Sequence, residues 1–350
     1  MRTDLSDLLA RGRAEGVYSA AAWSVGTAAG PLDRGVLGTR SWDRPCADAD
    51  SLWDLASVTK PVVGLAVLAL AERGALHLDD PLARHLPGYA GGDKAQLTVR
   101  QLLTHTSGLP GGTPLYRDHP TREALLAAIR TGPLRWAPGT RVEYSSQGFI
   151  VLGLVAEAAG GAPLDVLVAE LVTGPAGMTG TSFGPVPPAH AVSTEDCPWR
   201  GRVVCGQVHD ENAVVLGGIC GHAGLFATLS DLEALGAALA GGGGGLLKPA
   251  TFAEMTACAT EGLNLRRALA WQCLDVPGSP VGERLTRVSF GHTGFTGTSL
   301  WVEPDRGRYY VLLTNRVHPT RAGEGISRFR AGFHALATAV DDGRSAPAPA

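Results

Sequence analysis

The segment Ser57-Val58-Thr59-Lys60 immediately precedes the longest apolar stretch of the chain, residues 61–70. Proline has no amide hydrogen, so Pro61 is tolerated in a helix only in its first turn. The sequence therefore predicts a helix that begins near Ser57 and runs to about Arg73, where Gly74 ends it. A serine at this position lies close to the positive end of the helix dipole, which favours negative charge on its oxygen.

On such a helix Ser57 and Lys60 are three positions apart, so their side chains lie on one face about one turn from each other. A serine hydroxyl is barely ionised at neutral pH and needs a nearby base to act as a nucleophile. The S-x-x-K spacing supplies that base, and it is the arrangement found in serine acyl-enzymes. The spacing alone also occurs by chance in many chains, so its interpretation depends on the other motifs.

Strand patterns occur at both ends of the chain, and helix patterns lie between them. The predicted strands are residues 18–26, a segment near Val36, residues 297–302 and residues 308–314, with a turn at Pro304-Asp305-Arg306-Gly307. The predicted helices are residues 5–15, a helix capped by Thr98 and ending at Leu103, a helix capped by Ser146 and ending near Ala159, residues 231–239 after a capping box of Ser230 and Glu233, and residues 326–340.

This distribution predicts an α/β (α+β) fold in which one antiparallel sheet is built from both termini and flanked by helices. Residues 1–56 and 286–350 would form the sheet domain, and residues 57–285 would form a mostly helical inserted domain, with the active site between them. The last ten residues are predicted to be a disordered tail.

The composition limits the class of protein. The chain has 350 residues, of which 45% are hydrophobic and 18% charged, so it can bury a large core. A formal net charge of -3 gives no indication of nucleic acid or of an anionic membrane surface as a partner. The apolar stretch 61–70 is too short to cross a bilayer, and residues 1–6 contain no apolar signal segment. We therefore expect a cytoplasmic protein without a nucleic-acid or membrane partner.

The six cysteines show no C-x-x-C pair and no regular spacing, so we expect free thiols in a reducing compartment. A metal site would need cysteines and histidines clustered at short spacing, and His209-Asp210-Glu211 lacks the i,i+4 histidine pair of a zinc helix. The glycine run 241–245 lacks the Gly-Lys-Ser/Thr ending of a phosphate loop. We expect neither a metal nor a cofactor.

Two further motifs follow the first one. Tyr144-Ser145-Ser146 lies between a Pro-Gly turn and a predicted helix, and His292-Thr293-Gly294 opens a glycine-rich strand. The order and separation of the three motifs resemble the serine β-lactamase and penicillin-binding-protein superfamily, in particular its branch of class C β-lactamases, DD-peptidases, family VIII esterases and transacylases. Within residues 52–315, the supporting segments are residues 98–110, 175–179, 221–226 and 292–301.

The resemblance implies a role for each motif. Ser57 would attack the acyl carbon, while Lys60 and Tyr144 would share the proton transfers, one or both as general base. The backbone amides of Ser57 and Phe295 would form the oxyanion hole, whose donors each contribute on the order of 10²–10³ in rate. The choice between Lys60 and Tyr144 stays open, because two such groups can titrate as one unit.

The expected substrate-binding residues Ser146, His292, Thr293 and Gly294 depart from the family pattern at two positions. Ser146 replaces the more usual Asn of Y-x-N, so it offers a hydroxyl but no amide fork to Lys60 or to the substrate. His292 stands where many members carry the lysine of K-T-G. Because histidine is mostly neutral above a pH of about 6.5, whereas lysine is a permanent cation, we expect weak dependence on a substrate carboxylate.

Three functions are compatible with these residues, since a fold does not choose its substrate. The first is an esterase or ATP-independent transacylase that moves an acyl group from a small ester-type donor to water or to an amine, with bacterial antibiotic biosynthesis as the expected setting. The second is a β-lactamase or D-amino-acid peptidase. The third is a non-catalytic binding domain, against which the intact Ser57, Lys60 and Tyr144 argue. The oligomeric state is open.

A rival serine motif is Gly180-Thr181-Ser182-Phe183-Gly184, which fits G-x-S-x-G. That nucleophile elbow needs a buried strand before the serine and a helix after it. Glycines and prolines surround this segment on both sides, so we do not expect a nucleophile elbow here.

Overall fold

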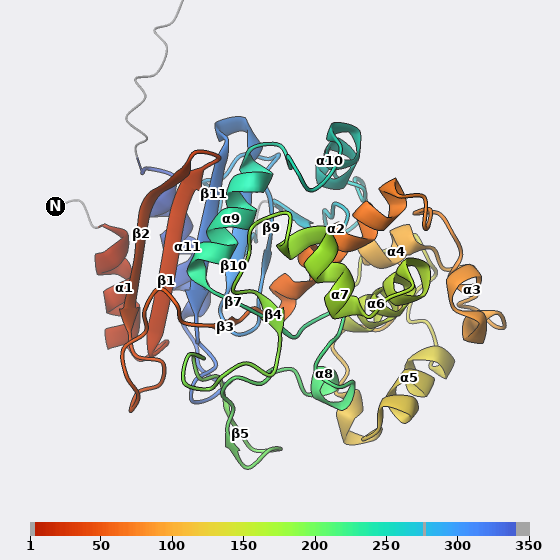
Figure 1. The fold of residues 1–350 in the computed structure, drawn as a ribbon, viewed down its shortest axis with the longest axis horizontal. Coiled ribbons are helices and arrows are strands. Elements are labelled where there is room, and N and C mark those ends of the chain that lie inside the picture. Colours follow the sequence, from red (N-terminus) through yellow and green to blue (C-terminus); the bar gives the residue numbers. More distant parts are fainter. Residues whose placement is uncertain (1–3, 276–277, 341–350) are drawn as a thin grey trace, which may run out of the picture.

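The structure is a computed structural model that describes residues 4–275 and 278–340. Its main element is a six-stranded antiparallel sheet with the strand order β2-β1-β11-β10-β9-β8. The N-terminal β1 pairs with the C-terminal β11, so the predicted sheet built from both termini is confirmed (Figure 1). The six strands are β1 Ala20–Thr27, β2 Gly30–Gly38, β8 Gln272–Cys273, β9 Phe290–Thr293, β10 Ser299–Glu303 and β11 Arg308–Thr314.

Helices cover both faces of this sheet (Figure 1). Successive side chains of a strand point to opposite faces of the sheet. Two consecutive residues of one strand therefore belong to the hydrophobic cores on different faces. Trp301 of β10 packs with Leu9 and Phe333 from the helices on one face, whereas Leu300 packs with Leu232 on the other. The covering helices are α1 Leu5–Ala14 and α11 Ile326–Ala337 on the first face and α9 Leu229–Ala240 on the second.

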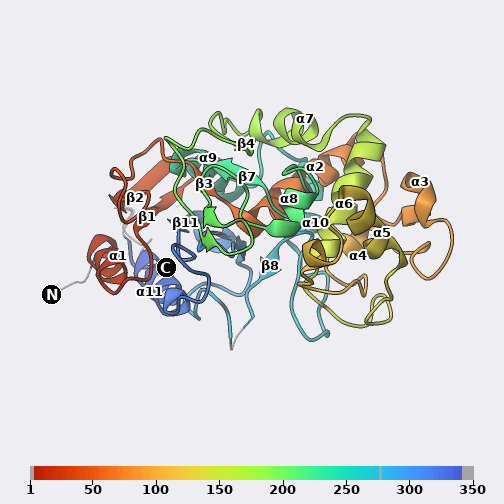
Figure 2. The same cartoon turned by 90° about the horizontal axis from the view of Figure 1, so that it is seen from below.

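Helices are the main regular elements of the rest of the described chain, which lies beside the sheet (Figure 2). Its helices are α2 Thr59–Glu72, α3 Leu82–His85, α4 Val99–Leu103, α5 Arg122–Thr131, α6 Ser146–Gly160, α7 Leu164–Val168 continued by a π-helical segment Ala169–Thr173, α8 Glu211–Val215 and α10 Pro249–Thr256. Short 3₁₀ helices are Ala56–Val58, Pro87–Tyr89, Leu115–Arg117 and Pro304–Arg306. Two small sheets contain β3 Trp53–Asp54, β4 Ser182–Phe183 and β7 Leu225–Ala227, and β5 Asp196–Cys197 with β6 Arg202–Val203.

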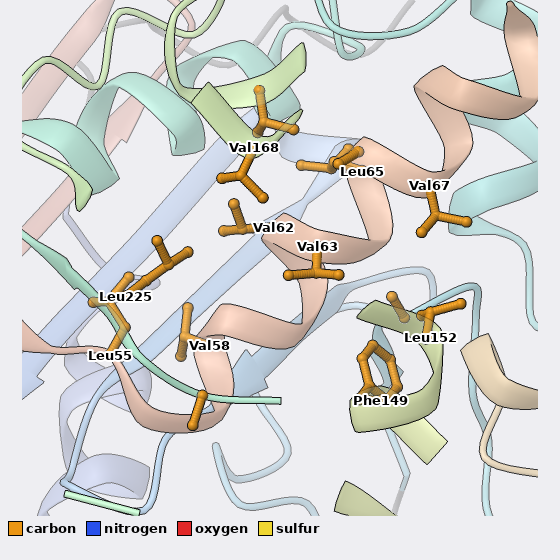
Figure 3. Close-up of a cluster of buried hydrophobic side chains, with 14 of the residues drawn as sticks. Leu55, Val58, Val62, Val63, Leu65, Val67, Phe149, Leu152, Val168 and Leu225 are labelled. Carbon is orange, nitrogen blue, oxygen red and sulfur yellow. The ribbon is translucent and has the colours of Figure 1, made fainter. Parts of the chain in front are cut away.

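Helix α2 is the centre of the hydrophobic core and starts beside Ser57. Figure 3 shows Val62 and Leu65 of this helix together with Phe149 of α6 and Val168 of α7, all buried in one cluster. Burying each such side chain stabilises the fold by about 1.5–3 kcal/mol as an upper estimate. The predicted helix is confirmed, with Ser57 in a 3₁₀ turn directly before it and the last helical residue one position before Arg73.

Two predicted helix caps were wrong. Ser145, not Ser146, caps α6, since its hydroxyl accepts a hydrogen bond from the Gly148 amide. Helix α9 begins before the predicted Ser230–Glu233 box, so Thr228 and Asp231 form the capping box instead. In both cases a second polar residue at the helix start offered an equivalent pattern, which sequence alone does not separate.

Other boundaries agree with the sequence more closely. Thr98 and Gln101 form a capping box at α4, and β11 has the predicted bounds. Helix α11 ends at Ala337 rather than at residue 340, and the predicted tail lies outside the described residues. The division into 1–56 plus 286–350 and 57–285 stays a prediction, although β8 and α9 from the latter range belong to the sheet and its cover.

Within residues 4–275 and 278–340, no single helix combines the length and the apolar character needed to cross a membrane. Helix α6 and the following helix that ends at Thr173 meet those criteria only as a pair, and the pair is bent by 81° at its break.

Candidate active site

Ser57 and Lys60 are in direct contact. Lys60 Nζ donates a hydrogen bond of 3.0 Å to Ser57 Oγ and another of 3.0 Å to the main-chain carbonyl of His222. The lysine side chain is fully buried, while Ser57 is half-buried. The predicted nucleophile Ser57 is therefore reachable from solvent. The amine of Lys60 lies behind it, held between Ser57 Oγ and the carbonyl oxygen of His222.

Tyr144 lies beside this pair, directly before α6. Lys60 Nζ is 4.9 Å from the centre of the Tyr144 ring, and the ring of His292 is 5.9 Å away on the other side. Lys60 therefore contacts the face of the Tyr144 ring. The tyrosine hydroxyl makes no hydrogen bond with another described residue. The hydroxyl is thus available to a substrate group.

His105 supports Tyr144 from behind. Its ring centre is 4.7 Å from that of Tyr144, and its Nδ1 accepts a hydrogen bond of 3.0 Å from the Ser145 amide. Burial, followed by the charges of Arg267 and Lys60, holds the pKa of His105 well below its usual value. His105 also has a left-handed backbone, with φ 59°. Its neutral ring and this backbone conformation together fix the turn that carries Tyr144.

The predicted oxyanion hole has the required backbone. Ser57 lies in the first turn of a helical segment, where amides have no intrahelical partner, and the Phe295 amide makes no hydrogen bond with another described residue. Thr298 Oγ1 donates to the Leu55 carbonyl at 3.0 Å, which ties the turn after β9 to the segment before Ser57. A Cβ on Gly294 would lie 2.0 Å from Thr298 Oγ1, so only glycine permits this approach.

Asp54 organises the segment immediately before the nucleophile, and no motif in the sequence marks it. Its buried carboxylate accepts hydrogen bonds from the amides of Ala56 (2.8 Å) and His209 (2.6 Å). Ala56 has a left-handed backbone with φ 47°, which is costly for a residue with a side chain and persists where surrounding contacts enforce it. Burial raises the pKa of Asp54, opposed by these two amides.

His292 lies on β9 with Thr293 and Gly294, and all three line the same cavity as Ser57 and Tyr144. Its Nδ1 is 2.9 Å from the Thr293 carbonyl, so Nδ1 carries the hydrogen of the neutral ring. Burial first, and the Lys60 charge second, lower the pKa of His292 to about 3. The structure therefore places a neutral imidazole at this position, as expected from the sequence.

Two cavities meet at Ser57 and Phe295. The larger cavity has a volume of about 690 Å³ and lies between the sheet edge and the start of α11. The smaller cavity has a volume of about 390 Å³ and includes Ser146, Tyr116 and Asp210. Ser146 is thus near the nucleophile, but it makes no hydrogen bond with Lys60. A substrate bound at Ser57 can extend in two directions.

Three guanidinium groups line the larger cavity, and sequence reasoning placed none of them there. They belong to Arg267, Arg316 and Arg330. Arg330 is only 7% exposed, and its Nε has no hydrogen-bond partner. Burial, and then the neighbouring Arg316, lower the pKa of Arg330 to about 10. No pattern marks these residues in the sequence, because they come from three separate segments that meet only in the folded chain.

An ionic cluster adjoins the smaller cavity, whose lining includes its members His209, Glu211 and Arg321. Arg321 donates to the carboxylates of Glu195 and Glu211, and His209 Nε2 is 3.0 Å from Glu195 Oε2. Glu195 and Glu211, together with Cys197, have the spacing of metal ligands. The guanidinium of Arg321 already occupies both carboxylates, so this cluster is built as an ion-pair network rather than as a cation site.

The rival serine is separate from this site. Ser182 lies on the short edge strand β4, is exposed and lines neither cavity. No helix follows it within the next residues, as the elbow would require. The expectation of a non-elbow segment is confirmed.

Comparison with known proteins adds independent support. The sequence profile described as Beta-lactamase matches residues 7–334. A protein of Escherichia coli (strain K12) with the provisional name D-alanyl-D-alanine carboxypeptidase is 32% identical, and the match covers 78% of this chain and 70% of that protein.

Solved structures show the same fold. EstCE1, described as a hydrolase with promiscuous acyltransferase activity, has a TM-score of 0.75 and 21% identity over 94% of this chain and 97% of its own. The octameric penicillin-binding protein homologue from Pyrococcus abyssi has a TM-score of 0.75 and 20% identity over 96% of this chain and 76% of its own.

Proposed function

Because the chain belongs to the Beta-lactamase family, and is thus an enzyme of the serine hydrolase type, we propose that it forms an acyl-enzyme on Ser57 from an ester-type donor. The acyl group then passes to water or to an amine, as in an esterase or an ATP-independent transacylase. The observation that carries this proposal is the 3.0 Å contact between Lys60 Nζ and Ser57 Oγ at the junction of two cavities.

The acylation step follows from the positions of these groups. Ser57 Oγ attacks the acyl carbon while its proton moves to the Lys60–Tyr144 pair, and the carbonyl oxygen gains a negative charge at the amides of Ser57 and Phe295. The tetrahedral intermediate then collapses, the bond to the leaving alkoxide breaks, and the pair returns the proton to that oxygen. Neutral His292 beside Tyr144 adds no competing charge to this transfer.

The second step repeats the first with a new nucleophile. Water or an amine loses a proton to the pair, attacks the acyl carbon and releases Ser57 with its hydroxyl restored. The two cavities allow the acyl group to lie on one side of Ser57 and the attacking group to approach from the other. We propose small molecules for both donor and acceptor; the cytoplasmic location and the place in antibiotic biosynthesis stay predictions.

A partition experiment tests this function. The protein is given p-nitrophenyl acetate with increasing butylamine, and both acetate and N-butylacetamide are quantified. We expect products only with Ser57 intact, and the fraction of amide reports transfer against hydrolysis. Wild type that releases nitrophenol no faster than Ser57→Ala would overturn the proposal.

A second candidate, a peptidase that acts on a substrate with a free carboxylate, is favoured by the larger cavity. The expectation of weak carboxylate dependence rested on His292 alone, whereas the cavity is lined by Arg267, Arg316 and Arg330. The same lining contains one carboxylate, that of Glu324, so its net charge remains positive. The provisional name of the Escherichia coli relative is consistent with this candidate. A buried guanidinium with an unused donor is a strong site for a carboxylate.

Matched donors separate the two candidates. Thioester donors that differ only in a terminal carboxylate or its methyl ester are compared, together with a D-alanyl-D-alanine peptide. If the peptidase candidate holds, the carboxylate donor has the lower KM and Arg330→Gln removes that difference. Equal KM values for both donors, unchanged by Arg330→Gln, would leave the esterase or transacylase as the function.

A further inference from the structure

The position of Lys60 depends on a segment far from it in the sequence. Besides Ser57 Oγ, Lys60 Nζ binds only the carbonyl oxygen of His222 among the described residues, at 3.0 Å. These two acceptors come from different elements, the turn before α2 and the turn before β7. A shift of the His222 carbonyl would therefore move the lysine amine relative to Ser57.

The side chain of His222 holds its own turn in place. The ring is 1% exposed; its Nε2 is 2.9 Å from Asp210 Oδ1, and its Nδ1 is 3.1 Å from Cys220 Sγ. Although burial disfavours the charged ring, the Asp210 carboxylate outweighs it and raises the pKa of His222 to about 10. A buried imidazolium, paired with a half-buried carboxylate that lines the smaller cavity, thus lies next to the catalytic lysine.

Both ends of this pair are anchored. Asp210 Oδ1 also accepts a hydrogen bond of 2.9 Å from the Ala213 amide at the start of α8. On the other side, Gly221 lies directly against the backbone of α6, where a Cβ would be 2.1 Å from the Phe149 carbonyl. The turn that contains His222 is therefore packed against α6 on one side. On the other side, the hydrogen bond between His222 and Asp210 connects it to the start of α8.

From this geometry we propose that His222 and Asp210 act as a positioning pair, which fixes the His222 carbonyl so that Lys60 stays within reach of Ser57. This inference rests on the proposed acyl-enzyme function. Neither side chain transfers the reacting proton; their effect reaches it through a main-chain carbonyl. Misplacement of a catalytic group by about 1 Å can cost on the order of 10² in rate, which sets the expected scale.

The test uses p-nitrophenyl acetate and the full-length variants Asp210→Asn, His222→Gln and the double variant. Asparagine retains an oxygen for the Ala213 amide, so this variant keeps the helix start and decides the question if His222→Gln does not fold. We expect kcat to fall about 10- to 100-fold with KM within about 2-fold. Because the two residues act as one unit, the double variant should lose no more than the stronger single variant.

The remote His85–Asp80 pair is the control, since it has the same 2.9 Å histidine–carboxylate contact, with both side chains buried, and lines neither cavity. His85→Gln should leave kcat within about 2-fold, because this pair shares no contact with the groups at Ser57 and acts independently of them. The proposal is overturned if folded Asp210→Asn keeps wild-type kcat, if losses multiply in the double variant, or if the control loses as much. A failure of the proposed function looks different: wild type itself would then show no Ser57-dependent turnover.

Discussion

Around Ser57, several residues that carry no chemistry decide where the reacting groups lie. Asp54 holds the strained Ala56, and His105 holds the turn of Tyr144. Gly294 lets the turn after β9, which carries the second oxyanion donor, approach the nucleophile. The site is thus defined by backbone positions as much as by its side chains.

Gly294→Ala tests this dependence on the backbone. A Cβ there would lie 2.0 Å from Thr298 Oγ1 and 2.5 Å from the Leu55 carbonyl, so the Phe295 amide must move away. We expect kcat for p-nitrophenyl acetate to fall about 10²- to 10³-fold, the loss typical of one oxyanion donor. Gly112→Ala in the smaller cavity is the control, because no atom lies within 4 Å of its Cβ position. Equal activity of the two variants would refute an oxyanion donor at Phe295.

Sequence reasoning located the reacting residues better than their supports. Ser57 and Lys60 follow from helix spacing, and Tyr144 and His292 from the family pattern. The partners of Lys60 could not be found in this way, because His222 is 162 positions away and contributes only its carbonyl. The same holds for Arg330, whose approach to the cavity depends on how α11 packs against the sheet.

At the scale of single elements, α2 connects the core to the site. The helix carries Lys60 at its first turn, while most of its length is buried among apolar residues from α6, α7 and the strands. Its bounds were predictable from Pro61 and Gly74. The caps of α6 and α9 were not, because adjacent polar residues compete for the same role and the difference is one hydrogen bond.

Leu65→Ala tests the central position of α2. Leu65 is 1% exposed, so the truncation loses buried apolar area and leaves a cavity, and we expect the free energy of unfolding to fall by about 2–5 kcal/mol. Val166→Ala on α7 is the control, since Val166 is 47% exposed and the change should stay within about 0.5 kcal/mol. Urea denaturation measures both. A loss below about 1 kcal/mol for Leu65→Ala would contradict a tightly packed α2.

Over the whole molecule, the sheet built from both termini and the helices beside it bring distant segments to one place. The antiparallel fold was predicted from strand patterns at the two ends. The second sheet of β3, β7 and β4 was not predicted, since strands of two or three residues carry no periodicity to detect. It is this sheet that joins the segment before Ser57 to the segment after His222.

Buried histidines contribute to the dependence of global stability on pH. The pKa values of His292 and His334 are lowered to about 3 by burial, so the unfolded chain binds more protons than the folded one between pH about 6.5 and 3. Stability should therefore fall as pH decreases through that window. His222 acts in the opposite sense: its pKa is raised to about 10, so its contribution is lost as pH rises from about 6.5 to 10.

The variant His334→Leu isolates the contribution of one buried histidine to the pH dependence of stability. His334 is fully buried, and neither ring nitrogen has a hydrogen-bond partner. Between pH about 6.5 and 4.5, above the range of ordinary carboxylates, the fall of Tm with pH should be shallower in His334→Leu than in wild type. The exposed His190 provides the control variant His190→Gln, which should keep the wild-type slope. Identical slopes for all three proteins would contradict a neutral buried His334.

The most direct test of the central claim is peptide mass spectrometry of the protein after brief reaction with p-nitrophenyl acetate and acid quenching. We predict one acetyl group on the peptide that contains Ser57, and none on that peptide in Ser57→Ala. An acetyl group on another residue, with no labelling of Ser57 at any time point while nitrophenol is released, would contradict an acyl-enzyme on Ser57.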